Sequence, residues 1–357
     1  MFGVYIHVPF CTSRCDYCAF ATWTDRHHLM ADYVSACRRE LVAADLPPAT
    51  SVFVGGGTPS LLPAELLAGL IADVRLATDA EVTVECNPDD VSLPMLRTYR
   101  GAGVNRISIG VQSTVPHVLA ALGRVHDPAA VRRAANAVGE AGIGTYNVDL
   151  VYGSVGESVA DWTRSLDDVL ALDPVPTHVS AYGLTVEAGT PLAADPVRHP
   201  DDDDQATKYE LADEALTAAG LANYEISNWA VPGHECRHNR LYWSQGNYRG
   251  IGCAAHSHRA GRRWWTVRTP DRYIAAVNRG ETTEAGSEVL DDETRALEAL
   301  QLALRTRSGV AAEALDLRDP ALEGLLERSG DRVVLTRRGR LMANEVAMRL
   351  RPRVPAT

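Results

Sequence analysis

The sequence predicts an α/β protein made of parallel βαβ units, and three observations lead to this fold class. Short β-branched or apolar runs alternate with amphipathic segments rich in Ala, Leu, Arg and Glu through the first two-thirds of the 357 residues. Hydrophobic residues make up 46% and charged residues 23%, which is typical of a globular protein with a sizeable core. Glycine and polar signatures follow several predicted strands, and folds of this class carry their chemistry at that end of the strands.

The alternation defines six strands and the helices between them. The strands are predicted at 3–8, 51–54, 81–86, 106–111, 145–153 and 177–184. The helices are predicted at 25–44, 63–77, 92–101, 128–141 and 158–171. Right-handed crossovers should connect these units. Six such units form either an open doubly wound sheet or an incomplete TIM-like barrel, and hydrophobic periodicity does not distinguish the two.

The alternation ends near residue 190. An acidic start predicts a helix at about 202–219, because carboxylates suit the positive end of a helix. A short strand near 223–227 precedes an irregular, aromatic-rich stretch that extends to about 270. From 291 onwards, a helix, helices around 310–329, a short β element and a final helix resemble a winged-helix unit. We expect three parts: an α/β part at 1–225, an extension at 226–285 and a C-terminal helical domain at 286–357.

Charge and cysteine content limit the partners and the compartment. The net charge is −11, which disfavours non-specific binding to nucleic acid or to anionic membranes. No run approaches the ~20 apolar residues of an integral membrane segment, which leaves peripheral association open. The N-terminal "MFGVYIHVPF" lacks the features of a signal peptide. Seven cysteines are an odd and sparse number, so we expect a reducing cytoplasm, where clustered cysteines indicate metal binding.

Three of those cysteines stand within "CTSRCDYC", at Cys11, Cys15 and Cys18. Thiolates are the ligands that iron–sulfur clusters prefer, and three of them on a four-iron cube leave one iron open. A zinc site that recruits His7 as a fourth ligand is the alternative. Three thiols this close together without a ligand role would be a redox liability.

The second signal is "VGGGTPSLLP" at 54–63. Its glycines allow the backbone to approach a ligand closely, and the helix that follows offers free amide donors at its start. It is neither a Walker A loop nor the G-x-G-x-x-G of a nicotinamide-binding fold. A plain tight turn is the alternative interpretation.

The cysteine spacing C-x3-C-x2-C after the first strand, with Tyr17 before the last cysteine, resembles the radical S-adenosylmethionine superfamily. The resemblance implies a partial (β/α)6 barrel and a [4Fe–4S] cluster on Cys11, Cys15 and Cys18. It also implies that the amine and carboxylate of S-adenosylmethionine chelate the open iron. An electron from the reduced cluster, supplied by a flavodoxin or ferredoxin, would then release methionine and a 5′-deoxyadenosyl radical.

The same resemblance implies a set of contacts to S-adenosylmethionine. Gly56, Gly57 and Thr58 would hold its methionine end, and Arg124 would pair with its carboxylate, a task that suits a guanidinium. Each of these residues, taken alone, also fits a simple surface or supporting role. The remaining implied contacts are Tyr5, Tyr17, Glu85, Gln112 and Asp149.

Longer phrases narrow the resemblance over residues 5–284. "YIHVPFC", "GGGTPS", "NRISIGVQS", "LGRVHD" and "NYEISNWAVPGHECRHNRLYW" are similar to the oxygen-independent coproporphyrinogen III oxidase group, which contains oxidases and HemW-type heme chaperones. The oxidases carry a further cysteine where Phe20 stands here. The chaperone pattern H-N-x-x-Y-W is present, and it implies His238 as an axial ligand of heme iron. A surface histidine in an aromatic loop is the alternative.

Two departures from the group affect loops. Ser154 and Val155 replace a more usual Leu-Pro, and "GCAAHSH" at 252–258 differs from Gly-Ala-Gly-Ala-His-Gly. A zinc site or second metal site is a rival interpretation of five residues further along the chain, but their spacing matches no common zinc pattern. These residues are Cys236, His238, Cys253, His256 and His258.

These features favour a heme chaperone over an enzyme. We expect binding of heme and its delivery to an acceptor such as a respiratory enzyme. The first alternative is a coproporphyrinogen III oxidase, or dehydrogenase, that acts through the 5′-deoxyadenosyl radical. The second is a redox or metal-sensing regulator that interacts through its C-terminal unit, for which the acidic charge counts against DNA.

Overall fold

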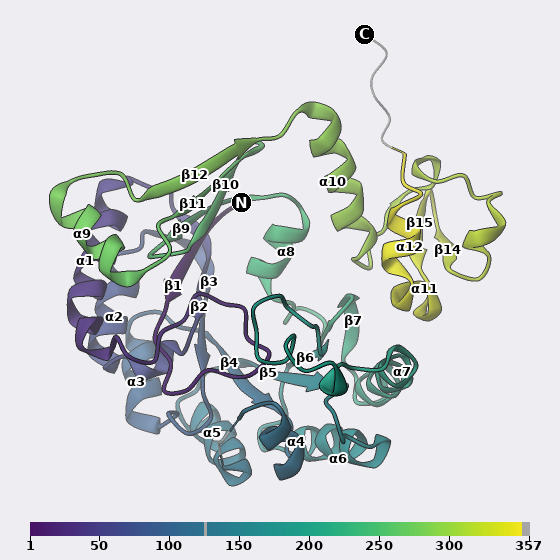
Figure 1. Cartoon of the computed structure of the whole chain (residues 1–357), viewed down its shortest axis with the longest axis horizontal. Helices are drawn as coiled ribbons and strands as arrows, with labels where there is room; N and C mark the ends of the chain where they lie inside the picture. The colour runs from purple at the N-terminus through teal and green to yellow at the C-terminus, as the bar shows by residue number, and fades with distance from the viewer. Residues whose placement is uncertain (125–126, 352–357) are drawn as a thin grey trace.

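A computed structural model describes residues 1–124 and 127–351 of the chain, and its centre is one 12-stranded sheet. The first six strands pair in parallel and in chain order, as the alternation predicts. β9 and β2 flank β1, whereas β5 and β8 flank β6, so the six units form a curved, open partial barrel (Figure 1). The six strands are β1 (Phe2–Val8), β2 (Ala49–Gly56), β3 (Leu76–Cys86), β4 (Arg106–Gln112), β5 (Thr145–Tyr152) and β6 (His178–Gly183).

Helices line the outer side of this curved sheet (Figure 1). Helix α6 shows how the sequence places them, because Ser158 and Asp161 form a reciprocal capping box at its start. Its Trp162, Leu166 and Val169 are buried at helical spacing against the core. The helices are α1 (Met30–Ala43), α2 (Ala64–Ala72), α3 (Leu93–Gly101), α4 (Pro116–Ala121), α5 (Pro128–Glu140) and α6 (Val159–Leu170).

Two predicted helices are shorter in the structure. The segment predicted at 25–44 begins with a 3₁₀ turn at His27–Leu29, and α1 follows it. The segment predicted at 63–77 ends at Ala72, because β3 begins at Leu76. Strand pairing begins just before β3, because the Ala49 amide of β2 donates to the Arg75 carbonyl over 2.8 Å.

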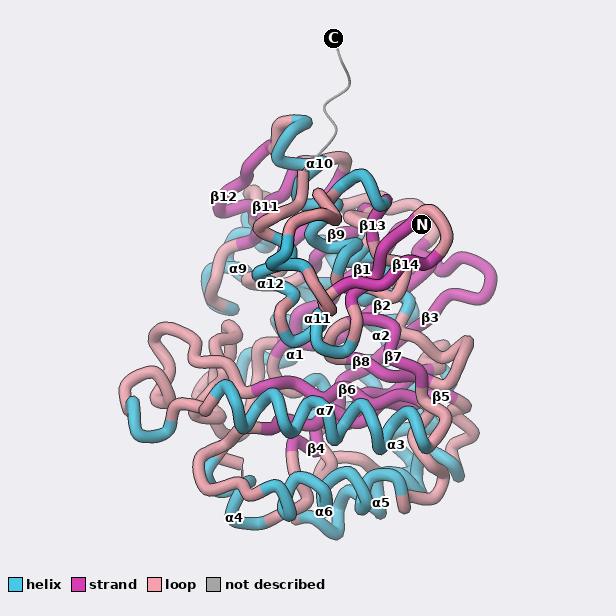
Figure 2. Tube along the Cα trace, turned by 90° about the vertical axis from the view of Figure 1, so that its right-hand side faces the viewer, coloured by secondary structure: helices cyan, strands magenta, loops and turns pink. Residues whose placement is uncertain are grey.

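The stretch predicted as irregular up to about 270 is instead ordered, so that prediction is wrong. Helix α7 (Asp202–Ala218) packs beside α6 and β6 (Figure 2), and β7 and β8 then extend the sheet beyond β6. After α8, β9 returns to pair in parallel with β1, and β10 to β12 continue antiparallel from it. These elements are β7 (Ala222–Glu225), β8 (Asn228–Ala230), α8 (Arg237–Trp243), β9 (Asn247–Ile251), β10 (His256–Arg259), β11 (Arg262–Thr266), α9 (Pro270–Arg279) and β12 (Glu284–Val289).

The C-terminal part has its own three-stranded sheet and its own core. The helices predicted around 310–329 are two 3₁₀ turns and the first strand of a hairpin, because proline and glycine interrupt this segment. Arg337 and Arg340 attach the unit to α7 through Asp213. The division at 225 and 285 stays a prediction. The elements are α10 (Asp292–Leu304), β13 (Val310–Ala311), β14 (Leu326–Ser329), β15 (Arg332–Leu335), α11 (Arg337–Leu341) and α12 (Ala343–Ala347).

Asp213→Ala is expected to loosen this attachment and to destabilise the protein by about 2 kcal/mol, because it leaves arginines without their partner. The carboxylate accepts from Arg337 at 2.8 Å, from Arg340 at 2.9 Å and from the Trp229 indole at 2.9 Å. Burial raises the pKa of Asp213, but these hydrogen bonds outweigh it, so the pKa is lowered. The stabilisation should therefore be present at neutral pH and be lost as acid protonates Asp213.

Urea unfolding at pH 7 measures this effect, with Glu214→Ala as the matched control. Glu214 is exposed and contacts only the outer guanidinium nitrogen of Arg337, so its loss should cost less than about 1 kcal/mol. Equal losses for both variants would show that Asp213 has no special role in the attachment.

In residues 1–124 and 127–351, no helix combines the length and the apolarity that crossing a membrane requires.

Candidate functional site

The three cysteines of the spacing C-x3-C-x2-C lie in the loop that follows β1. The Cys11 amide donates to the Trp23 carbonyl at 3.1 Å, and the Trp23 amide donates to the Pro9 carbonyl at 2.7 Å, so the loop folds back beside its own start. All three thiols are free and partly exposed. Burial raises the pKa of Cys11, and the nearby thiols of Cys18 and Cys15 raise it further. The loop thus gathers three thiols at one accessible place.

Two neighbouring side chains contact these thiols. The Thr58 hydroxyl lies 3.6 Å from the Cys11 sulfur, and the Arg124 guanidinium lies 3.6 Å from the Cys15 sulfur. Within the described ranges, no three Cys, His, Asp or Glu side chains converge closely enough for a single metal ion.

The glycine motif packs directly against the cysteine loop. A Cβ at Gly57 would lie 2.7 Å from the Phe10 carbonyl oxygen and 3.1 Å from the Cys11 sulfur. The amides of Gly57 and Thr58 donate to the carbonyls of Val8 and Phe10, each over 2.8 Å. The glycine motif thus holds the loop after β2 against the loop after β1, and the donors expected at the start of the following helix stay a prediction.

Glu85 and Asp149 face the interior of the partial barrel from neighbouring parts of the sheet. Glu85 accepts a hydrogen bond from the Gly56 amide at 3.1 Å. Asp149 accepts from Ser108 at 2.9 Å and from Asn147 at 2.8 Å. Burial, followed by the charge of Asp149, raises the pKa of Glu85 to about 8. Burial also raises the pKa of Asp149, against the hydrogen bonds it accepts. Two carboxyl groups are thus positioned as acceptors for hydroxyl groups.

Glu85→Gln is expected to stabilise the ligand-free protein at pH 8 by about 1–3 kcal/mol, since each unit of pKa shift corresponds to ~1.4 kcal/mol. The folded-state pKa is raised, so the wild-type protein loses stability as pH rises from the unfolded-state value through about 8. The gain should vanish near pH 4.5, the ordinary value for this group. Urea midpoints across this pH range measure it, with the exposed Glu140→Gln as control. A pH-independent gain would contradict the assignment.

Gln112 and Arg124 lie next to each other at the end of β4. Gln112 has a φ of 64°, which is unusual for a residue other than glycine and is typical of functional sites. Arg124 donates to the Gly110 carbonyl at 2.6 Å, while its buried Nε finds no hydrogen-bond partner among the described residues. The guanidinium therefore keeps donor capacity for an anionic group. Burial raises the pKa of Tyr17, the nearby Cys15 raises this pKa further, and the charge of Arg124 lowers it.

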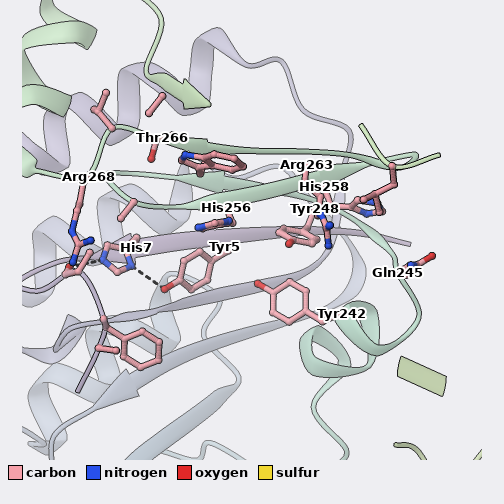
Figure 3. Close-up of a pocket in the computed structure, with 18 of the residues that line it drawn as sticks. Tyr5, His7, Tyr242, Gln245, Tyr248, His256, His258, Arg263, Thr266 and Arg268 are labelled. Carbon is pink, nitrogen blue, oxygen red and sulfur yellow. Dashed lines mark hydrogen bonds between the residues drawn. The ribbon is translucent and has the colours of Figure 1, made fainter. Parts of the chain in front are cut away.

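A cavity of about 820 Å³ opens beside the cysteine loop, between β1, β10, β11 and α10. Tyr5 and His7 of β1 line it together with Phe20, which is 66% exposed (Figure 3). The hydroxyl of Tyr5 lies 3.0 Å from Nδ1 of His7. Tyr242 and Tyr248 add two more aromatic walls. Phe20, two residues after Cys18, thus places an aromatic ring in the lining of this cavity.

His238 does not line this cavity. It is fully buried, with Nδ1 at 2.9 Å from the Ser51 hydroxyl and Nε2 at 2.9 Å from the Tyr242 hydroxyl. Burial lowers its pKa to about 3. The alternative of a surface histidine is therefore wrong. Its role as heme ligand stays a prediction, and in this conformation both ring nitrogens already have partners.

The rival metal set is not brought together. The sulfur of Cys236 lies 3.6 Å from a Glu81 carboxyl oxygen, and that of Cys253 lies 3.6 Å from the Tyr33 hydroxyl. Sequence reasoning also missed two residues that contact His238, because neither carries a motif: Ser51 contacts the ring, and a Glu81 carboxyl oxygen accepts from the His238 amide at 3.1 Å. They meet α8 only through the pairing of distant strands.

The fold and the three-cysteine loop define a radical S-adenosylmethionine protein, and residues 5–169 match the family model of the Radical SAM superfamily. The chain is 44% identical over 370 aligned positions to the protein named heme chaperone HemW of Mycobacterium tuberculosis (strain CDC 1551 / Oshkosh), covering 98% of this chain and 94% of that one. It is 35% identical to the protein of the same name from Escherichia coli (strain K12), covering 96% of each. This chain belongs to the HemW family within that superfamily.

A solved structure shows the same fold. Coproporphyrinogen III oxidase (HemN) from Escherichia coli matches with a TM-score of 0.83, covering 97% of this chain and 89% of that one, at 21% identity. The likeness concerns the architecture, and it confirms the partial barrel with its C-terminal unit.

Proposed function

We propose that this chain binds heme and delivers it to a heme-requiring acceptor protein. The observation that carries the proposal is the aromatic cavity of about 820 Å³ beside the cysteine loop, with Phe20 at its edge. This volume lies in the ~300–1,000 Å³ range of small-molecule sites. An apolar ring suits a porphyrin face, and a cysteine at this position is what the oxidases carry. Relatives named heme chaperone, matched over almost the whole chain, support the same function.

We further propose that Cys11, Cys15 and Cys18 hold a [4Fe–4S] cluster and that S-adenosylmethionine binds at the barrel rim. When bound, these groups supply one-electron chemistry. The Arg124 guanidinium, whose Nε has no hydrogen-bond partner among the described residues, would hold the carboxylate of S-adenosylmethionine. The carboxyl groups of Glu85 and Asp149 would hold its ribose hydroxyls. The other proposed contacts are Tyr5, Tyr17, Gly56, Gly57, Thr58 and Gln112.

The proposal extends to the compartment, the electron donor and the heme acceptor. We infer a cytoplasmic protein that receives its electron from a flavodoxin or ferredoxin. Its heme would pass to an acceptor such as a respiratory enzyme. His238 is the heme ligand that the motif predicts, and it would have to release Ser51 and Tyr242 before it could bind iron.

The test is a pair of anaerobic assays on the full chain with its cluster reconstituted. Heme titration should produce a Soret band with saturable binding. Incubation with coproporphyrinogen III, S-adenosylmethionine and reductant should yield no protoporphyrinogen, and release of 5′-deoxyadenosine should be followed in parallel. Formation of protoporphyrinogen would instead establish the oxidase alternative. Absence of heme binding would remove the chaperone proposal.

A further inference from the structure

Three histidines line the aromatic cavity, and two of them are already engaged by the protein. His7 contacts the Tyr5 hydroxyl and the Ala21 carbonyl, each at 3.0 Å. His258 contacts the Gly246 carbonyl at 2.9 Å and accepts from the Gly261 amide at 3.1 Å. His256 is exposed, and within residues 1–124 and 127–351 its ring makes no hydrogen bond. It is therefore the histidine of this cavity whose ring nitrogens are available to a ligand.

Strand pairing holds His256 towards the cavity. It stands in β10 opposite Trp265 of β11, and the two rings stack at 5.8 Å with an interplanar angle of 29°. Its neighbour Ser257 points to the other face, where its hydroxyl accepts from the Gly250 amide at 2.9 Å. Figure 3 shows His256 near Tyr5, between the end of the cavity that carries Arg268 and the end that carries Tyr248. The ring is thus placed on a rigid strand rather than on a loop.

The cavity also offers charge for a dianionic ligand. Arg268 and Arg272 line it, both are exposed, and neither forms an ion pair within the described ranges. Arg263 differs, because its guanidinium contacts Glu288 at 2.8 Å and Glu298 at 3.2 Å. Two arginines with unused charge in the lining of an aromatic cavity fit the paired carboxylates of a porphyrin.

We propose that His256 is an axial ligand of the heme iron when heme occupies this cavity, with the heme propionates held by Arg268 and Arg272. This assignment rests on the proposed heme function and adds to it the position of the heme. Tyr5, Tyr242 and Phe20 then line the porphyrin faces. This assignment replaces the ligand role that the motif predicts for His238, which through its hydrogen bond to Tyr242 is instead a positioning residue for that wall.

The protonation state suits this role. Partial desolvation of the ring within the cavity, followed by the neighbouring charge of Arg263, lowers the pKa of His256 below its ordinary value. A neutral imidazole, the form that binds iron, is therefore the main form at pH 7.

The test compares histidine variants of the full chain with the cluster reconstituted, using hemin titration and electron paramagnetic resonance of ferric heme. His256→Ala should weaken hemin binding at least tenfold and remove the histidine-ligated signal, and added imidazole should restore that signal. His28→Ala is the matched control, because His28 is exposed and lies outside the cavity. His238→Ala should lower affinity but keep the histidine-ligated signal.

The outcomes separate this inference from the function on which it rests. If the wild-type chain binds hemin and His256→Ala binds it within about twofold with the same spectrum, His256 is not the ligand, and heme binding stands. The same conclusion follows if the signal is lost in His238→Ala alone, or if imidazole fails to restore it in His256→Ala. If the wild-type chain does not bind hemin, the proposed function and this inference both fall.

A second set of variants tests the propionate contacts. Replacing both arginines, as Arg268→Gln with Arg272→Gln, should weaken binding of hemin several-fold but leave binding of its dimethyl ester nearly unchanged. An equal loss for both porphyrins would overturn this part of the assignment, because the ester carries no propionate charge.

Discussion

Cys15→Ser is expected to abolish the [4Fe–4S] cluster that we propose for the three-cysteine loop, with bound iron and sulfide reduced about tenfold or more after reconstitution. The reason is the ligand count, since the loop supplies three thiolates and a serine oxygen is a poor ligand for this soft cluster. The Arg124 contact at 3.6 Å would also lose its sulfur partner. Iron and sulfide analysis together with the charge-transfer absorption of the anaerobic protein measure the result.

A cysteine outside the loop provides the matched control. Cys37 lies buried in α1, so Cys37→Ala should lower stability modestly but leave the cluster intact. A cluster that survives in Cys15→Ser with unchanged iron content, or that is lost equally in Cys37→Ala, would contradict the assignment of the three-cysteine loop.

Gly57→Ala is expected to destabilise the protein by about 3 kcal/mol and to prevent stable cluster assembly. The added Cβ would lie 2.7 Å from the Phe10 carbonyl oxygen and 2.8 Å from the Val8 carbonyl oxygen. Both contacts are to backbone, so no flexible side chain can move aside. The two loops must separate, and the hydrogen bonds that the Gly57 and Thr58 amides make to those same carbonyls would weaken.

The same change from glycine to alanine at Gly69 is expected to have the opposite effect on stability. Gly69 lies inside α2, and a Cβ there would find its nearest contact at 3.8 Å, on the Arg38 side chain. Alanine favours a helix, so this variant should be stabilised by about 0.5–1 kcal/mol. Urea unfolding and iron content measure both variants. Comparable stability of the two would show that the contact between the loops is not as tight as described.

Much of the barrel could be predicted because its strands are buried on both faces. Parallel strands of this kind appear as nearly continuous runs of apolar or β-branched residues, such as the consecutive buried Val82, Thr83 and Val84 of β3. The strands of 226–285 escaped prediction because three to five residues are too few for a period, and polar side chains such as His256 and Arg263 interrupt them. The register of β9 depends on β1, which is more than 230 residues away in sequence.

By itself the sequence determined the family and the residues that point to its chemistry: three cysteines after the first strand, the glycine motif of 54–63 and Phe20 in place of a further cysteine. These are local patterns, and the spacing of a few residues along one loop is enough to define them. Only the tertiary structure decided which histidine faces the large cavity. The sequence motif favours His238, yet the return of β9 to β1 places His238 against Ser51 and leaves His256 open. Burial and free ring nitrogens depend on contacts between distant segments, so no local pattern encodes them.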